Sequence, residues 1–365
     1  MRERALGIAA PWRPAFFDVE EPDPEEGRLH VETVYTGLSA GTELTYLKGT
    51  NPHLHASWDA DAGVFRPDRP AVGYPVRRLG YMEVGRVTES RAVGFAEGEL
   101  VAMTYGHATG HVADPLRERV VPLPPDVDPV LGVLVAHMGP ICANGVLHAA
   151  AEAHGRDVRE LGDGVRGRCV LVVGAGVIGL LVGLLAQRLG AAEVAVTDET
   201  DERLAAAAAL GLQPLDEREA EPWRVLKDRW PHGPRDRGAD VAFNCRGRVA
   251  ALATALRSLR PQGAVIELAF HTGGAGELQL GEEFHHNGLS IRCAQIGRVP
   301  RGLAHAWDRE RLSRETIALL RDRGDAIRSH LVTDVVALDD APELMLAVAR
   351  REHHVIQAVF AGPGA

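Results

Sequence analysis

Short apolar runs alternate with apolar or amphipathic helical segments through the middle of the chain. Residues 169–173 form an apolar, β-branched run without alternation, which is typical of a strand covered on both faces. Residues 177–189 are mostly apolar and contain no proline, so they predict a buried helix. The further segments of this kind are strands at 192–197, 240–245, 263–270 and 289–295, and helices at 202–210 and 249–259. The alternation predicts an α/β fold with a doubly wound parallel sheet.

The two ends of the chain have a different pattern. Alternating apolar positions at 5–10, 27–35, 79–87, 98–103 and 118–124 predict a β-rich region. Residues 49–75 have no periodicity and predict a long loop, and residues 130–151 predict one helix. The tail predicts a helix at 310–322, a strand at 331–338, a helix capped by Asp339 or Asp340, and a strand at 354–360. We therefore expect one domain from residues 1–145 and 298–365, and a second from residues 146–297.

A glycine-rich turn follows the strand at 169–173. Gly174, Gly176 and Gly179 have the spacing G-x-G-x-x-G. The first glycine permits a tight turn, the second lets the backbone approach a pyrophosphate, and the third lets the helix lie close to the strand. The N–H groups of the helix start, including Val177 and Ile178, would face the diphosphate. The order of strand, turn and helix predicts dinucleotide binding.

The next strand ends in an acidic residue. Asp198 lies 19 residues after Gly179, where a carboxylate would accept hydrogen bonds from an adenosine ribose. This residue would repel a 2′-phosphate, so we expect NAD(H) to be preferred over NADP(H). Arg203 leaves the alternative open, because a nearby arginine can accommodate that phosphate.

Other polar residues follow the remaining strands of the predicted sheet. Ligands of open α/β sheets bind at the carboxyl ends of the strands. The residues at or just beyond these ends, which we predict to contact the cofactor, are Asn244, Arg246, Phe270, His271 and Gln295.

Composition narrows the classes of function. The chain has 365 residues, of which 45% are hydrophobic and 25% charged, as in ordinary globular proteins of two domains. A net charge of -10 gives no basic surface for nucleic acid or for an anionic membrane. The four cysteines are widely spaced and indicate neither a disulfide framework nor a C-x-x-C site. Without a signal-like start or a membrane-length apolar run, we expect a cytoplasmic protein that acts on a small molecule.

The order of these motifs resembles the medium-chain dehydrogenase/reductase superfamily, the relatives of zinc alcohol dehydrogenase, over essentially the whole chain. The segments that carry the resemblance are 36–39, 80–87, 98–101, 139–145, 174–179, Asp198 and 338–342. The resemblance implies a Rossmann domain and a GroES-like β-rich catalytic domain built from both ends of the chain. It also implies an oxidoreductase that commonly forms homodimers.

Catalytic zinc in the resembled enzymes is held by cysteine, histidine and a further cysteine or aspartate. At the matching places this sequence has Ser39, Tyr81 and Pro140, which are not zinc ligands. The stretch 105–115, which corresponds to the lobe for structural zinc, contains no cysteine. His107 and His111 lack further ligands nearby, and we interpret them as surface or turn histidines. We therefore expect no metal, and the segments 37–43, 268–271, 283–292 and 294–297 resemble a zinc-lacking branch that includes bacteriochlorophyllide dehydrogenase.

Without a Lewis acid, hydrogen-bond donors must stabilise the alkoxide. Tyr81 is the first candidate donor, and a packed core tyrosine is the alternative. Ser39 and Thr42 are candidate relay hydroxyls or helix caps. Glu43 is a base if burial raises its pKa, or it interacts with the helix dipole. His137 is a second proton carrier, or a core histidine on a helix face.

Three functions are compatible with these residues. The first is a zinc-independent NAD(H)-dependent oxidoreductase for a secondary alcohol or ketone, with secondary metabolism as the hypothesised context. The second is an enone or quinone reductase. The third is a non-catalytic nucleotide-binding subunit, which would bind the cofactor without turnover.

Overall fold

The computed structural model describes all of residues 1–365, and the chain divides into two units. The first unit consists of Met1–His137 and Val332–Ala365, and the second of Met138–Leu331. The sequence placed the boundaries at residues 146 and 298 instead. Two helices account for the difference, because α3 (Met138–His154) and α9 (Arg309–His330) pack against each other and against α4 (Val177–Arg188) in the second unit.

The second unit contains a six-stranded parallel sheet with the order β12-β11-β10-β15-β16-β17. Its strands are β10 (Cys169–Val173), β11 (Glu193–Asp198), β12 (Gln213–Asp216), β15 (Ala239–Asn244), β16 (Leu259–Glu267) and β17 (Ser290–Cys293). The chain runs outward from β10 on one side and restarts at β15 on the other. Ligand sites of doubly wound sheets lie at the carboxyl ends of the strands beside such a reversal.

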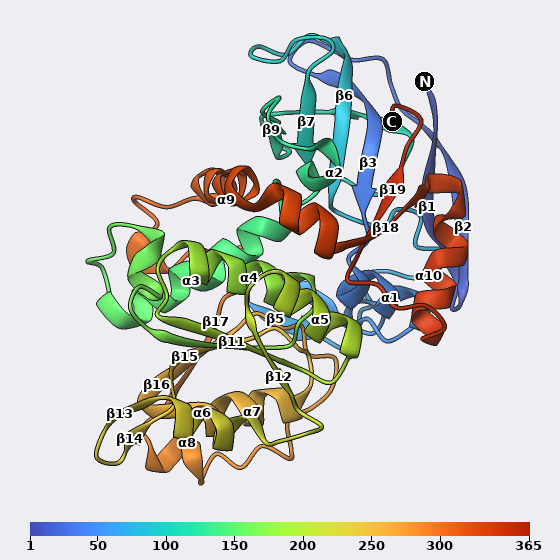
Figure 1. The fold of residues 1–365 in the computed structure, drawn as a ribbon. Helices are drawn as coiled ribbons and strands as arrows, with labels where there is room; N and C mark the ends of the chain where they lie inside the picture. The colour runs from blue at the N-terminus through green and yellow to red at the C-terminus, as the bar shows by residue number, and fades with distance from the viewer. The chain divides into compact units, whose positions relative to one another are not determined.

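Helices cover both faces of this sheet, as Figure 1 shows. One layer holds α3, α4, α5 (Asp201–Ala209) and α9, and the other holds α6 (Pro222–Arg229), α7 (Val249–Ser258) and α8 (Glu283–His286). The central strands are buried on both sides, which explains why their sequences are continuously apolar. A short hairpin of β13 (Pro231–Gly233) and β14 (Asp236–Arg237) lies outside the sheet.

The first unit is mostly β structure. Its main sheet has the order β18-β19-β3-β6-β7-β9, and β8 also pairs with β3. These strands are β3 (Leu29–Gly37), β6 (Glu83–Ser90), β7 (Leu100–Met103), β8 (Gly110–Ala113), β9 (Val120–Pro122), β18 (Val332–Ala337) and β19 (Gln357–Ala361). A hairpin of β1 (Arg2–Ala10) and β2 (Arg13–Glu20) packs with α1 (Ala40–Lys48) and α10 (Ala341–Arg350). Strands from both ends of the chain thus pair within one unit, since β19 lies beside β3.

Two sequence-based element predictions were wrong. Residues 130–151 form two helices, α2 (Pro129–Gly132) and α3, instead of one. Pro140 lies in the first turn of α3, where its missing N–H group costs nothing, but it would break the interior of a longer helix. The expected loop at 49–75 contains a 3₁₀ turn (Pro52–Leu54) and a hairpin of β4 (Ser57–Asp59) and β5 (Val64–Arg66).

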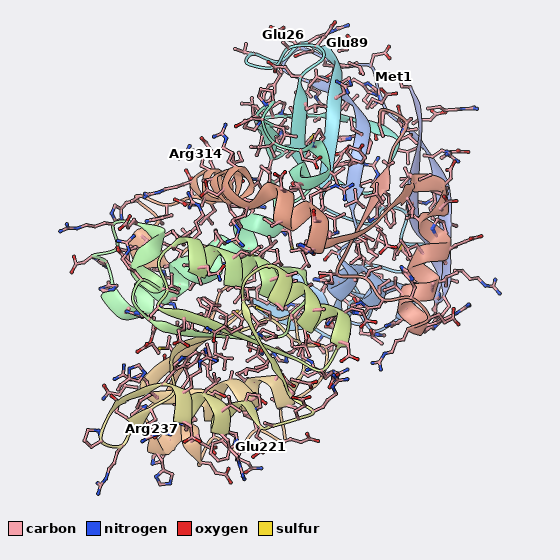
Figure 2. The ribbon with its side chains drawn as sticks, viewed as in Figure 1. Met1, Glu26, Glu89, Glu221, Arg237 and Arg314 are labelled. Carbon is pink, nitrogen blue, oxygen red and sulfur yellow. The ribbon has the colours of Figure 1, made fainter.

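Charged side chains lie at the surface of each unit. In Figure 2, Glu26 and Glu89 lie at the outside of the first unit, and Glu221, Arg237 and Arg314 at the outside of the second. None of the helices is long and apolar enough to cross a bilayer.

Candidate functional site

The glycine turn lies at the carboxyl end of β10. Gly174 has a φ of 100°, a left-handed conformation that favours glycine. A Cβ at Gly179 would lie 1.8 Å from the carbonyl oxygen of Gly174, so this glycine lets α4 approach the turn. A Cβ at Gly176 would meet no atom within 4 Å. The second glycine thus faces open space at the start of α4, where Val177 and Ile178 are partly exposed.

Asp198 holds the turn to the end of β11. Its carboxylate accepts hydrogen bonds from the backbone N–H groups of Ala175 (2.9 Å), Glu199 (2.8 Å) and Thr200 (3.0 Å), and it is buried. Arg203 Nη1 lies 3.6 Å from Asp198 Oδ2. Burial acts to raise the pKa of Asp198, but the charge of Arg203 and the N–H donors outweigh it and lower the pKa. The residue is therefore an anion that organises the glycine turn.

The other predicted cofactor residues have different surroundings. Asn244 is buried, and its amide donates a 2.8 Å hydrogen bond to Glu267 Oε2. Arg246 is held by two acidic side chains, and Phe270 is exposed just beyond the end of β16. His271 Nε2 lies 3.4 Å from Glu267 Oε2. Gln295 is exposed, and its side chain accepts a hydrogen bond from the N–H group of Gly297.

The five predicted catalytic residues come together in the first unit. The hydroxyls of Tyr81 and Ser39 are hydrogen-bonded, and the Tyr81 hydroxyl lies 3.4 Å from Thr42 Oγ1. The Tyr81 ring meets the ring of His137 edge to face, with centroids 4.7 Å apart. Ser39 occupies the N-cap position of α1, but its hydroxyl does not cap the helix. His137 precedes α3 instead of lying on a helix face, and it is partly exposed.

Glu43 lies behind these hydroxyls in the first turn of α1, and it is buried. Its Oε1 accepts the N–H group of Ser39 at 2.8 Å, and its Oε2 lies 2.7 Å from Nε2 of His107. The other ring nitrogen of His107 is hydrogen-bonded to the hydroxyl of Thr36. Sequence reasoning missed His107 and Thr36, although the spacing of His107 and His111 drew attention to that segment.

His107 and His111 were expected to be surface or turn histidines, and the surface placement was wrong. Both are buried. A Cβ at Gly106 would lie 2.3 Å from the carbonyl oxygen of Leu79, and one at Gly110 would lie 2.8 Å from that of Val31. These two glycines signal close backbone packing, which carries the flanking histidines into the interior.

Tyr81 is a protonated donor in these surroundings. Burial raises the pKa of its phenol, the hydrogen bonds with Ser39 and Thr42 oppose this effect, and the charge of Glu43 adds to it. Tyr81 and Thr42 line a pocket of about 580 Å³ in the first unit. Tyr46, Arg77, Leu79 and Gly80 also line this pocket. This volume lies within the range of small-molecule sites.

A second buried polar group lies in the main sheet of the first unit, on β3, β6 and β8. Glu83 accepts a 2.7 Å hydrogen bond from the hydroxyl of Thr33, and its Oε1 lies 3.7 Å from Nδ1 of His111. The ring of Tyr105 stacks on His111 with centroids 3.4 Å apart. Burial raises the pKa of Glu83 to about 8, against the opposing hydrogen bond from Thr33, and lowers the pKa of His111 to about 3. Both side chains are therefore neutral at pH 7.

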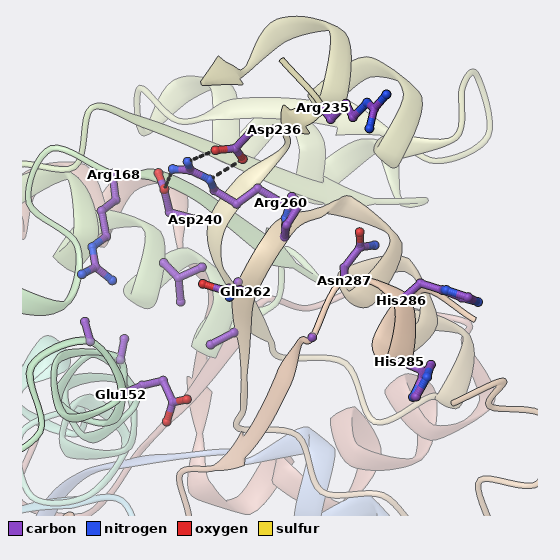
Figure 3. A pocket seen from close by; sticks show the side chains of 17 residues that line it. Glu152, Arg168, Arg235, Asp236, Asp240, Arg260, Gln262, His285, His286 and Asn287 are labelled. Atoms are coloured by element: carbon purple, nitrogen blue, oxygen red, sulfur yellow. Dashed lines mark hydrogen bonds and ion pairs between the residues drawn. The ribbon is translucent and has the colours of Figure 1, made fainter. Parts of the chain in front are cut away.

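A hollow of about 990 Å³ lies at the amino ends of the parallel strands, whereas the glycine turn lies at a carboxyl end. Figure 3 shows the side chains that line this hollow. At this edge, donor atoms of Cys169, His232 and Asp240 lie within 4.8 Å of one another and could hold a metal ion. Asp240 already accepts hydrogen bonds from the N–H group of Cys169 (2.8 Å) and from Arg260 (2.6 Å). A structural zinc takes four ligands, so this group is one short.

The sheet, the glycine turn and the split β-rich unit define a Rossmann domain combined with a GroES-like domain. The fold has close structural counterparts. An alcohol dehydrogenase from Thermus sp. ATN1 superposes with a TM-score of 0.74 at 19% identity, covering 98% of this chain and 99% of the other. A structure from Sinorhizobium meliloti 1021 bound to NADP gives 0.71 at 17% identity, with 99% of each chain covered.

Sequence similarity points to the same class. The family described as zinc-binding dehydrogenase matches residues 177–309. The D-guloside 3-dehydrogenase of Escherichia coli K12 is 27% identical over 93% of this chain and 94% of its own length. The L-threonine 3-dehydrogenase of Mesorhizobium japonicum is 27% identical over 74% and 71%, respectively. These similarities support the medium-chain dehydrogenase/reductase superfamily, and the chain is an oxidoreductase enzyme.

Proposed function

We propose that the protein is a zinc-independent, NAD(H)-dependent oxidoreductase that interconverts a secondary alcohol and a ketone, and that it represents a zinc-lacking branch of the superfamily. The observation that carries this proposal is the Tyr81 hydroxyl cluster. Tyr81 and Ser39 stand where the resembled enzymes have zinc ligands, and here their hydroxyls bind each other.

The donor chemistry of these residues does not fit catalytic zinc. A neutral phenol, a hydroxyl and the ring of Pro140 do not replace thiolate and imidazole. The nearest imidazole and carboxylate, His107 and Glu43, are buried and hydrogen-bonded to each other. No step of the proposed reaction is therefore assigned to a metal.

A nicotinamide dinucleotide does fit the second unit. The support is the open space beside Gly176 and the anionic Asp198 at the end of β11. When bound, a nicotinamide would supply hydride transfer to or from the carbinol carbon, and the accompanying hydroxyl proton would be exchanged with solvent through Tyr81 and the relay hydroxyls of Ser39 and Thr42. Asp198 supports NAD(H), since its negative charge opposes a 2′-phosphate, although a structural neighbour holds NADP.

The first unit supplies a hydrogen-bond donor for the substrate oxygen. The raised pKa keeps Tyr81 protonated, so the phenol can stabilise the developing alkoxide without a metal. Ser39 and Thr42 orient this hydroxyl, and Glu43 with His107 fixes the backbone of Ser39. A secondary alcohol is the proposed substrate because two relatives are named for dehydrogenation at carbon 3, an internal position.

The test combines metal analysis with an activity panel. Purified protein is assayed with NAD⁺ or NADH against glycosides, polyols and hydroxy acids or their ketones, and in parallel against enones and quinones. Turnover of a secondary alcohol or ketone by protein with far less than one zinc per chain supports the proposal. Turnover of enones or quinones alone favours the reductase alternative, and activity that requires one tightly bound zinc refutes zinc independence.

A change at Asp198 must preserve the glycine turn. Removing the carboxylate in Asp198→Ala would release three backbone N–H groups, so a loss of binding would have two explanations. Asp198→Asn keeps an acceptor oxygen and removes the charge. We expect this variant to fold and to lose part of the preference for NADH in fluorescence titrations.

A further inference from the structure

Arg246 is held between two carboxylates at the carboxyl edge of the parallel sheet. Glu199 directly follows β11, Glu217 directly follows β12, and Arg246 lies two residues beyond β15. Arg246 Nη1 lies 3.2 Å from Glu217 Oε2, and its Nη2 bonds to Glu199 Oε1. Three loops are thus joined through one guanidinium. We call Glu199 and Glu217 the acidic clamp.

The clamp lies beside the glycine turn. A Cβ at Gly174 would lie 3.1 Å from the Cβ of Arg246, so the stem of this arginine packs against the first glycine. Glu199 is the neighbour of Asp198 in the chain, and the N–H group of Glu217 donates to the carbonyl oxygen of Asp198 at 3.1 Å. The guanidinium therefore lies where the adenosine end of a bound dinucleotide is expected.

The arginines of this edge already have acidic partners. Arg246 has two, Arg203 lies 3.6 Å from Asp198, and Arg248 lies 3.3 Å from Glu199. A 2′-phosphate would have to compete with these carboxylates for every guanidinium. Glu217 also has a buried oxygen, Oε1, without a hydrogen-bond partner. That oxygen can accept a hydrogen bond from a hydroxyl or an amine, and it repels a phosphate.

We propose that the acidic clamp neutralises Arg246 and makes Glu217 a determinant of cofactor specificity, which selects NAD(H) over NADP(H). This inference rests on the nucleotide binding of the proposed function, but not on the substrate. It assigns the preference for NAD(H) to Glu199, Glu217 and Arg246 as well as to Asp198. It also predicts that specificity changes when the clamp is opened and Asp198 is left intact.

The experiment measures dissociation constants for NADH and NADPH by fluorescence titration at fixed, low salt. Glu217→Gln removes one charge of the clamp and leaves a side chain of similar size. We expect the ratio of the NADPH to the NADH dissociation constant to fall about tenfold, since one carboxylate less opposes the phosphate. Glu219→Gln is the matched control, because it removes the same charge two residues away, on an exposed side chain. Thermal unfolding of each variant checks that the fold is retained.

A double variant tests whether the gain passes through Arg246. In Glu217→Gln combined with Arg246→Gln, no released guanidinium is available, so the gain in NADPH binding should disappear. An unchanged ratio in Glu217→Gln, with NADH binding intact, overturns the clamp. So does a wild type that prefers NADPH. Failure of the wild type to bind either nucleotide refutes the proposed function itself, which keeps the two failures distinct.

Discussion

Gly176 and Gly179 belong to the same turn, but a methyl group added at each would meet different surroundings. In Gly179→Ala, the new Cβ would lie 1.8 Å from the carbonyl oxygen of Gly174 and 3.2 Å from Val172 Cγ1. Real Cβ atoms essentially never approach within 3.0 Å, so the start of α4 must move away from the turn. In Gly176→Ala, the Cβ would meet no protein atom within 4 Å, and the φ of −77° suits alanine.

The expected effects on stability follow from these distances. The clash in Gly179→Ala is with rigid backbone, and overpacking of this kind costs at least about 2 kcal/mol. For a unit of the size of Met138–Leu331, this lowers the melting temperature by roughly 4–8 °C. Gly176→Ala should change stability by less than about 1 kcal/mol, because a small loss at the N-cap is offset by the lower entropy of the unfolded chain.

Gly176→Ala, which should hardly change stability, should strongly weaken NADH binding. Its Cβ would enter the open space where the diphosphate is expected, so NADH affinity should fall at least about tenfold with little change in melting temperature. Differential scanning fluorimetry and NADH titration of both variants measure the two quantities. Wild-type NADH binding by Gly176→Ala, or a wild-type melting temperature for Gly179→Ala, would refute the assigned roles of these glycines.

Three further predictions concern the candidate catalytic cluster, a buried carboxyl group and metal content. Tyr81→Phe should lower kcat about 100-fold or more, because the alkoxide loses its hydrogen-bond donor. Tyr46→Phe changes another tyrosine of the same pocket and should keep a near-wild-type kcat. Equal kcat values for the two variants would contradict the role of Tyr81. Burial raises the pKa of Glu83 from 4.5 to about 8, so the folded protein keeps a proton that the unfolded chain releases, and this contribution to stability is lost as pH rises from about 4.5 to about 8. Glu83→Gln should therefore melt above the wild type at pH 8–9 and close to it at pH 5; a lower melting temperature at high pH would instead indicate a charged pair. Plasma mass spectrometry should find far less than one zinc per chain, and any zinc that His232→Ala removes without loss of activity belongs to the amino edge of the sheet, not to the reaction.

Local patterns were sufficient for much of the second unit. The apolar strand at 169–173, the glycine spacing and the acid at the end of the next strand act within about thirty consecutive residues, so their geometry is largely local. Most strand and helix positions of the doubly wound sheet agree with the structure for the same reason. The fold class is confirmed by the structural neighbours.

Local patterns failed where contacts between segments distant in the chain decide the structure. The break between α2 and α3 follows from Pro140, which could have been recognised in the sequence. The domain boundaries could not, because α9 is assigned to the second unit by its packing on α3, more than 150 residues away in the chain. The burial of His107 and His111 depends on close contacts of Gly106 with the backbone of Leu79 and of Gly110 with the backbone of Val31, both distant in the chain.

By itself, the sequence determined the doubly wound sheet and the glycine turn with Asp198, because these depend on residue identity and short spacing. Only the tertiary structure decided which side chains meet. It joined Tyr81 to Ser39, placed His107 behind Glu43, and enclosed Arg246 between Glu199 and Glu217. These contacts link loops and strands that lie apart in the chain, and their hydrogen bonds form only when the packing within each unit has brought those segments together.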